Sequence, residues 1–243
     1  RHRTAFKPLD YSLFLLNTAL FFSLSMRFLS ELDTRVGGLL CVLLAAVNVV
    51  FALRFFRDER VPRNLVYLLI GIVLTFISLA APIQLDGNYI TLFWAAEGVL
   101  LVWFAHRSGI KLVERASMAV TVLMVISLLM DLGLDNAPRH IAMQPLVNRL
   151  FITGLAAIGS LALQHRLWAN WAREHEPLYG LSVGSLRGIY AAAATVLGFI
   201  VGLLELNYQL DRFLPDGSVA MAEMAYILLY LLLVDRFTRN AAS

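Results

Sequence analysis

Eight long apolar runs constrain this chain more than any other feature of its sequence. The runs approach the roughly 17–25 residues that an α-helix needs to cross the hydrocarbon core of a bilayer. The composition agrees, because 59% of the residues are apolar and 15% are charged, whereas a soluble domain is about half apolar and a quarter charged. We therefore predict an all-α fold, a polytopic transmembrane helical bundle of about eight spanning helices.

Prolines, Asp-Gly pairs and basic turns set the limits of the predicted helices. Pro8 suits a helix start, because its missing N–H is not needed in the first turn. Pro82 is expected to end the third helix, and Asp86-Gly87 to form the turn before the fourth. The eight predicted spans cover residues 9–28, 36–56, 64–81, 89–105, 112–130, 149–164, 189–206 and 219–234.

The distribution of basic residues predicts the orientation of the bundle. Fifteen of the 20 lysines and arginines fall in the N-terminal segment, the even-numbered connections and the C-terminal segment. Cytoplasmic loops carry the excess of Lys and Arg, so both termini are predicted to lie inside. The expected location is a bacterial inner membrane, with the lipid bilayer as the main partner. The formal net charge of only +3 gives no argument for a nucleic-acid partner.

We treat residues 1–243 as one transmembrane domain. Asp86-Gly87 and Asp216-Gly217 each precede a helix that bears a glutamate and ends in arginine. This weak similarity suggests two four-helix halves, about 1–110 and 111–243. The chain begins with Arg1, so we expect it to be a fragment of a longer protein.

Small residues recur on one face of several predicted helices, which suits close helix packing in lipid. The second helix carries such a stripe, made of Gly38, Cys41, Ala45, Asn48 and Ala52, and the fourth carries another, made of Thr91, Ala95, Gly98, Val102 and Ala105. In the seventh helix, Gly198 and Gly202 are spaced to let two helix backbones approach.

Glu97 is the strongest candidate for a functional residue. It lies near the middle of the fourth predicted helix, where an ionised side chain costs on the order of 3 kcal/mol unless it is paired, hydrated or protonated. We therefore expect Glu97 to face the bundle interior. It is either a ligand, proton or ion site, or a structural glutamate that is protonated or hydrogen-bonded to another helix.

Three further charged residues are expected near the outer ends of the helices. Glu205 and Glu223 belong to the seventh and eighth helices, and Arg149 opens the sixth. They are candidates for a shared vestibule, in which the arginine would keep the carboxylates ionised. The alternative is that each is an ordinary interfacial charge that extends to water.

The chain lacks the common signatures of catalysis and of cofactor or metal binding. Its five histidines are scattered, its single cysteine excludes an internal disulfide, and no phosphate-binding loop or nucleophile elbow occurs. We predict no cofactor and no metal, and no catalytic residue can be assigned. Trp168 and Trp171 stand among charged residues, and we expect them to anchor an interfacial loop rather than to bind a ligand.

Three segments resemble a known family. Leu85-Asp86-Gly87 is followed by Trp94-Ala95-Ala96-Glu97-Gly98 and Val102-Trp103, and a second segment reads Asn148-Arg149-Leu150-Phe151-Ile152-Thr153-Gly154. Together with Glu205 before an acidic-aromatic loop, these residues are similar to the domain-of-unknown-function family DUF2339. The resemblance implies a many-spanning bacterial inner-membrane protein, and it carries no known activity.

Three functional hypotheses follow. The leading one is a transporter-like or lipid- or small-solute-binding envelope protein, with an outward-opening cavity lined by Glu97. The second is a structural or assembly scaffold, joined to membrane-protein partners or to copies of itself as a homo-oligomer. The third is a membrane-embedded enzyme acting on a lipid-linked envelope substrate through acids such as Asp86, Asp211 and Glu205. The sequence favours a non-enzymatic protein.

Overall fold

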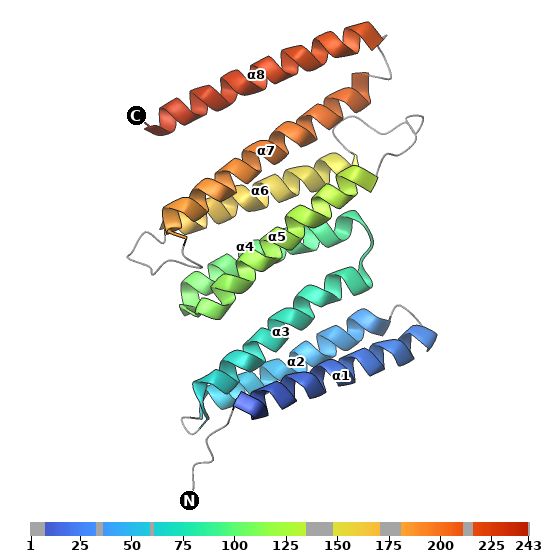
Figure 1. Cartoon of the computed structure of the whole chain (residues 1–243), viewed down its shortest axis with the longest axis vertical. Helices are drawn as coiled ribbons and strands as arrows, with labels where there is room; N and C mark the ends of the chain where they lie inside the picture. The colour runs from blue at the N-terminus through green and yellow to red at the C-terminus, as the bar shows by residue number, and fades with distance from the viewer. Residues whose placement is uncertain are drawn as a thin grey trace, which may run out of the picture. The chain divides into compact units, whose positions relative to one another are not determined.

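The computed structural model describes residues 8–32, 36–58, 61–134, 148–170, 181–210 and 216–242 (Figure 1). The described residues form eight helices: α1 (Pro8–Leu32), α2 (Val36–Phe56), α3 (Arg63–Gln84), α4 (Asn88–Ser108), α5 (Lys111–Leu134), α6 (Arg149–Asn170), α7 (Val183–Leu210) and α8 (Asp216–Ala242). All eight are long and apolar enough to cross a membrane. The predicted all-α transmembrane fold is therefore confirmed, while its orientation in the membrane stays a prediction.

The prediction that Pro82 ends the third helix is wrong, because α3 continues to Gln84. A proline removes one hydrogen bond inside a helix, but here only the last turn is affected. The backbone N–H of Leu85 still donates to the carbonyl of Ala81 at 2.8 Å. The Asp86-Gly87 turn is present, and Gly87 has a φ of +51°, which a residue with a side chain rarely adopts.

Several helices extend further than the apolar runs predict. α6 continues to Asn170, α7 starts at Val183, and α8 runs on to Ala242. The added turns contain charged and polar residues, which a hydropathy pattern assigns to loops. A helix can continue past the hydrocarbon core because its backbone hydrogen bonds do not depend on side-chain polarity.

The helices divide into two compact units. The first contains α1, α2, α3 and the first turns of α5, within residues 1–86 and 110–116. The second contains α4, the rest of α5, α6, α7 and α8, within residues 87–109 and 117–243. The predicted repeat of two four-helix halves stays a prediction.

The first unit is held by close packing of α2 on α3. The predicted small-residue stripe of α2 is buried, from Gly38 to Ala52. Gly38 shows why a small residue is needed there, since an added Cβ would lie 2.6 Å from Cβ of Gln84 on α3. Near the middle of the pair, the ring of Phe76 packs against Phe22 of α1, with centroids 5.2 Å apart.

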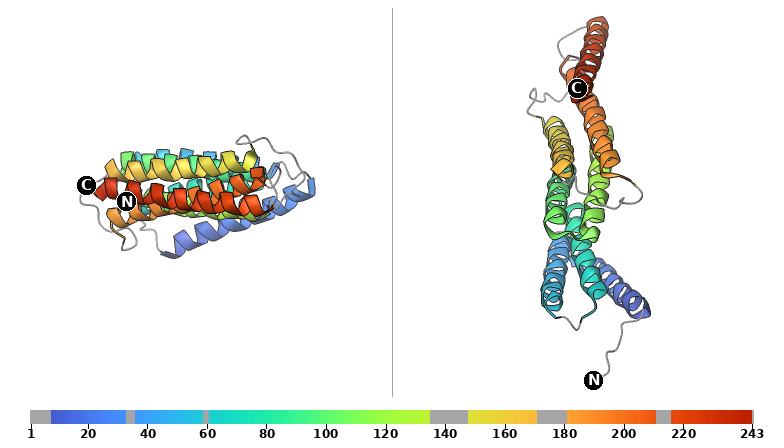
Figure 2. Two further views of the ribbon diagram at one scale, coloured as in Figure 1. Left: turned by 90° about the horizontal axis from the view of Figure 1, so that it is seen from above. Right: turned by 90° about the vertical axis from the view of Figure 1, so that its left-hand side faces the viewer.

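In the second unit the helices lie nearly along one direction (Figure 2). α4 and α6 are parallel, because Asn88 meets Thr153 and Ala95 meets Ser160, with the same separation of 65 residues. α7 packs antiparallel to α6, because Gly154 near the start of α6 contacts Val201 and the later His165 contacts the earlier Arg187. The side chain of Val201 occupies the space left by the missing side chain of Gly154. This alternation is the one expected when consecutive helices cross a membrane in opposite directions.

Tyrosines of α8 occupy the glycine face of α7. The hydroxyl of Tyr230 donates to the carbonyl of Thr195 at 2.6 Å, and that of Tyr226 donates to the carbonyl of Phe199 at 3.1 Å. A Cβ at Gly198 would lie 2.9 Å from the Tyr230 hydroxyl, and one at Gly202 would collide with Tyr226. The prediction that these glycines allow the backbone of another helix to approach is wrong on this face, because the phenol groups of Tyr226 and Tyr230 occupy the space beside them.

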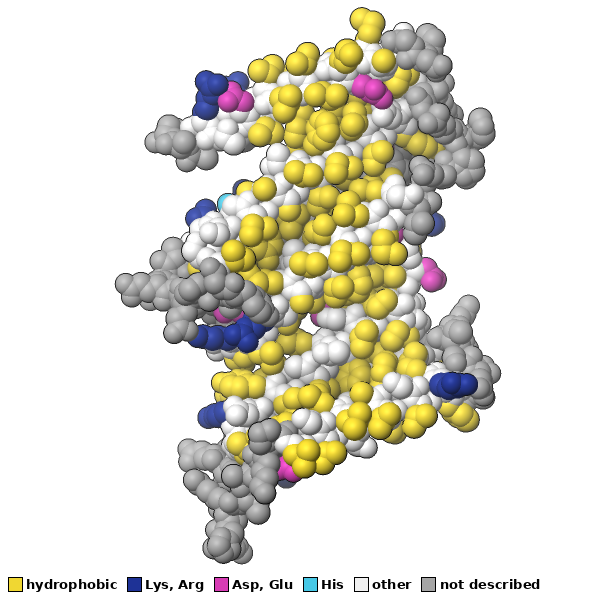
Figure 3. Space-filling model, viewed as in Figure 1, with side chains coloured by type: hydrophobic (Ala, Val, Ile, Leu, Met, Phe, Trp, Pro, Cys, Tyr) yellow, Lys and Arg dark blue, Asp and Glu magenta, His cyan; other side chains and the backbone are white. Residues whose placement is uncertain are grey.

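The surface of the helices is strongly apolar. On the face shown in Figure 3, hydrophobic side chains cover the middle of the helices, and the visible charged side chains lie mostly toward helix ends. Leucines of α8 are among the most exposed, such as Leu228 and Leu232 at 63% and 65%. Such a surface suits lipid rather than water.

Candidate functional site

Glu97 lies on the most buried of the eight spans. In the most apolar window of α4, 39% of the residues are buried, a larger share than in any other span. The predicted small-residue face is buried throughout, from Thr91 to Ala105. Glu97 is buried beside that face and only 7% exposed. A carboxyl group therefore lies inside the protein at mid-helix and does not face lipid.

A buried chain of hydrogen bonds crosses α5, α6 and α4 near the level of Glu97. The Thr121 hydroxyl donates to Oε1 of Gln164 at 2.8 Å, and Nε2 of Gln164 donates to the Ser160 hydroxyl at 3.1 Å. Ser160 in turn donates to the backbone carbonyl of Ala95 at 2.7 Å. Each hydroxyl and amide thus joins one helix to the next, away from lipid.

Gly98 makes room for this chain. A Cβ there would lie 3.0 Å from Nε2 of Gln164 and 3.3 Å from the Thr121 hydroxyl. Both atoms are themselves buried, since Gln164 is 0% and Thr121 7% exposed. Consecutive residues of α4 therefore supply a buried carboxyl group, at Glu97, and the space that the polar side chains of Gln164 and Thr121 occupy, at Gly98.

A second polar cluster lies closer to the start of α4. The Thr91 hydroxyl donates to Oδ2 of Asp131 and lies 2.7 Å from the Ser127 hydroxyl, both on α5. One turn earlier, Asn88 donates to the Thr153 hydroxyl of α6 at 3.2 Å. Glu97 is nine residues beyond Asn88, which is about 13 Å along the helix axis.

The other predicted site residues lie toward that same end of unit 2. Glu205 of α7 is half-buried and accepts hydrogen bonds from Asn148 and from Gln209. Asn148 also caps α6, because its Oδ1 accepts the backbone N–H of Phe151 at 2.7 Å. The structure thus joins Glu205 to the start of α6 through Asn148, the neighbour of the predicted partner Arg149.

Arg149 and Glu223 are less closely integrated. Arg149 is exposed, and its backbone carbonyl accepts the hydroxyl of Thr153 at 2.7 Å. Glu223 is half-buried in the first part of α8. A shared vestibule for these residues stays a prediction, as does the role of Glu97. Asp211, named for the enzyme hypothesis, lies outside the described residues.

The expectation that Trp168 anchors an interfacial loop is wrong. Trp168 belongs to α6 and is 0% exposed. It follows Gln164 by four residues and therefore lies on the same buried face. The Tyr190 side chain of α7 lies against both Trp168 and Thr121. Trp171, its predicted companion, lies outside the described residues.

The polar face of α5 is a part of the site that the sequence analysis does not predict. Ser117, Thr121 and Ser127 are buried, and Asp131 accepts the bond from Thr91. Their spacings of four, six and four residues, ending at Asp131, are a usable signal for one polar helix face. Serine and threonine alone are a weak signal, because they are common in apolar helices, where they often bond their own backbone.

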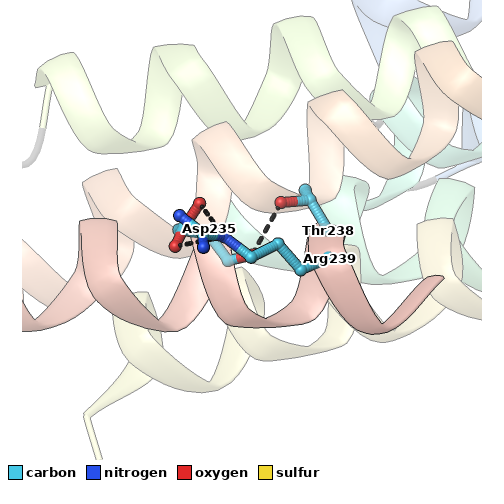
Figure 4. Close-up of polar contacts among 3 residues, drawn as sticks. All are labelled: Asp235, Thr238 and Arg239. Atoms are coloured by element: carbon cyan, nitrogen blue, oxygen red, sulfur yellow. Dashed lines mark hydrogen bonds and ion pairs between the residues drawn. The ribbon is translucent and has the colours of Figure 1, made fainter. Parts of the chain in front are cut away.

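No group of three or more His, Cys, Asp or Glu side chains that could hold a metal ion occurs in the described ranges. The charged end of α8 also has a simple structure. Arg239 donates through Nε to Asp235 at 2.9 Å, one helical turn away, and Thr238 bonds the Asp235 carbonyl (Figure 4). Both partners are well exposed, so substitutions in this pair are suitable controls for substitutions inside the bundle.

Comparison with known proteins gives one match. No curated protein and no solved structure matches the chain. A family model described as predicted membrane protein, DUF2339, matches residues 2–242. This span covers nearly the whole chain, including α4, the polar face of α6 and Glu205. The chain belongs to the DUF2339 family of predicted membrane proteins.

Proposed function

We propose that the protein is a transporter-like component of a bacterial inner membrane, in which Glu97 binds and releases a proton. One observation carries the proposal, namely that Glu97 is only 7% exposed at the middle of a spanning helix. An acid at membrane depth is costly to keep ionised, so a position of this kind is functional more often than a surface acid.

The polar groups around α4 support a path to that carboxyl group. From the start of α4, the path would pass the Asn88–Thr153 and Thr91–Asp131 pairs. It would then reach the Thr121–Gln164–Ser160 chain near Glu97. Hydroxyl and amide groups can accept and donate in turn, which suits proton movement and the binding of small polar solutes.

Glu205, Glu223 and Arg149 would flank the entrance of this path. In the predicted orientation the entrance faces outward, because the start of α4 follows an outer turn. Glu205 fits this role best, since it is linked through Asn148 to the start of α6. Protonation of the Glu97 carboxylate from one side, followed by release of that proton to the other side, would give directional transfer.

The test uses purified protein in liposomes that contain a pH-sensitive dye. A potassium gradient with valinomycin sets a membrane potential, and the internal pH is followed over time. We expect proton uptake with the wild-type protein, and Glu97→Gln should reduce it to the rate of protein-free liposomes. Asp235→Asn removes an exposed acid in the α8 pair and should leave the rate unchanged. Equal rates for wild type and Glu97→Gln would refute the proposal.

A scaffold is the second candidate, and a specific observation favours it. The buried hydroxyls and amide of α4, α5 and α6 bond to one another and to backbone, which is how polar groups join helices in lipid. In this case Glu97→Gln would leave function and assembly intact. Gly198→Leu would disrupt the fold, because its side chain would displace Tyr230.

A further inference from the structure

An apolar groove lies between α4 and α6 on the outside of unit 2. Its lining consists of Val99, Leu100, Trp103, Leu163, Arg166 and Leu167, and its volume is about 430 Å³. Leu100, Trp103 and Leu163 are 62%, 52% and 52% exposed. The groove is therefore open to the membrane and differs from the buried polar chain at Gln164. It does not depend on the role proposed for Glu97.

Arg166 is the one charged residue in this lining. It is exposed, and within the described part of the chain its guanidinium takes part in no hydrogen bond or ion pair. A cation on an apolar wall needs an anion or water, and an arginine near the end of a spanning helix extends toward the headgroup layer. Guanidinium and phosphate match well, because the planar fork can form two parallel hydrogen bonds.

The lining of the groove has a cation toward the helix ends and apolar side chains farther from them, which suits a lipid headgroup and an acyl chain. Arg166 lies four residues before the end of α6, which is about 6 Å along the axis. Trp103 lies five residues before the end of α4, at the level where tryptophans gather near membrane interfaces. Leu100 and Leu163 extend the apolar wall toward the bilayer centre.

The surroundings of Arg166 favour a negatively charged headgroup over a zwitterionic one. The last turn of α4 contains His106 and Arg107. At the start of α7, the backbone carbonyl of Arg187 accepts a hydrogen bond from Nδ1 of His165 on α6, at 3.0 Å. Basic pockets between membrane helices select anionic lipid headgroups in this way.

We propose that the groove between α4 and α6 is a binding site for one anionic phospholipid, with its phosphate on Arg166 and an acyl chain along Leu100 and Leu163. Bound lipid would occupy the groove that these side chains line on the outside of the two parallel helices. The occupant is a membrane lipid, and soluble phosphate esters lack the chain that the apolar wall requires.

The test is native mass spectrometry of the full chain in detergent, with equal amounts of phosphatidylglycerol and phosphatidylcholine added. We expect the wild-type protein to retain phosphatidylglycerol with a preference of about fivefold, the value of one basic residue near an anionic headgroup. Arg166→Gln should remove the preference. Leu163→Trp, which fills the groove and leaves Arg166, should reduce retention of both lipids.

Two controls keep the test decisive. Arg239→Gln removes an exposed arginine at the end of α8, and it should retain the wild-type preference. Thermal unfolding of each variant checks the fold, and both groove substitutions lie at exposed positions. The proposal is wrong if Arg166→Gln keeps the preference, or if Arg239→Gln loses as much as Arg166→Gln. Displacement of lipid by glycerol phosphate would also overturn it.

Discussion

The buried faces of α2 and α3 carry mainly small and apolar side chains, whereas those of α4, α5 and α6 carry hydroxyls and amides. Asn48 is the buried amide of α2, and it donates to the carbonyl of Leu44 in its own helix. Gln164 is the buried amide of α6, and it bonds Ser160 on its own helix and Thr121 on α5.

This difference matters because lipid tails are as apolar as leucine, so burial of apolar surface alone does not hold membrane helices together. The α2–α3 pair therefore depends on shape, through close contacts such as Gly38 on Gln84. The α4–α6 group adds directional bonds, which fix how each helix is rotated and how far it is shifted along its neighbour. A polar interior of this kind can also carry protons or solutes.

The largest loss of stability is expected at the α2–α3 contact, which depends on close packing at Gly38, a residue without a side chain that could form a hydrogen bond. Gly38→Ala should destabilise the protein by about 2 kcal/mol, because its Cβ would lie 2.6 Å from Cβ of Gln84, an atom fixed by the helix backbone. The matched control is Gly71→Ala on α3, whose Cβ would meet Leu112 at an ordinary 3.5 Å. Thermal unfolding in detergent compares the two. Equal melting temperatures for the two variants would contradict the claim that close packing at Gly38 stabilises the α2–α3 pair.

An intermediate effect separates the two buried amides. Gln164→Met should cost about 1 kcal/mol, because it removes hydrogen bonds to Ser160 and Thr121 while keeping the side-chain length. Asn48→Leu should cost less than about 0.5 kcal/mol, since only a bond within its own helix is lost. Unfolding by titration with a denaturing detergent measures both. If Asn48→Leu lost more stability than Gln164→Met, the claim that interhelical hydrogen bonds matter more in the second unit than in the first would be wrong.

The smallest effect is expected outside the packed helices. Asp235→Asn removes the ion pair with Arg239, and both side chains are more than half exposed. Water and salt screen such a pair, so its contribution is about 0.3 kcal/mol or less. The melting temperatures of wild type and variant should differ slightly at low salt and coincide at high salt. A loss as large as that of Gln164→Met would show that α8 depends on this pair.

The sequence predicted the helices and their buried faces well, because lipid imposes a length and a polarity on every span. The stripe from Gly38 to Ala52 and the face from Thr91 to Ala105 are both buried as expected. Glu97 was also expected inside, and it is. These features depend only on the spacing of residues within a single helix, so each can be predicted without knowing the neighbouring helices.

Partners between helices could not be predicted in the same way. Thr121 and Gln164 are 43 residues apart, and no local pattern links them. The charged residues around Trp168 in the sequence predict an interfacial position, yet α6 continues past Trp168 and this side chain is buried. The glycines of α7 indicated a close neighbour, but not that tyrosines of α8 would supply it.

The parallel pairing of α4 and α6 has a consequence for biosynthesis. Asn88 and Ala95 meet their partners on α6 only after 65 further residues have been made. At about 5–20 residues per second, a ribosome needs roughly 3–13 s for that length. During this interval α5 is the neighbour that can satisfy Thr91, through Ser127 and Asp131. The chain must therefore hold a helix with an acid at its centre in the membrane while the third member of the group is still being synthesised.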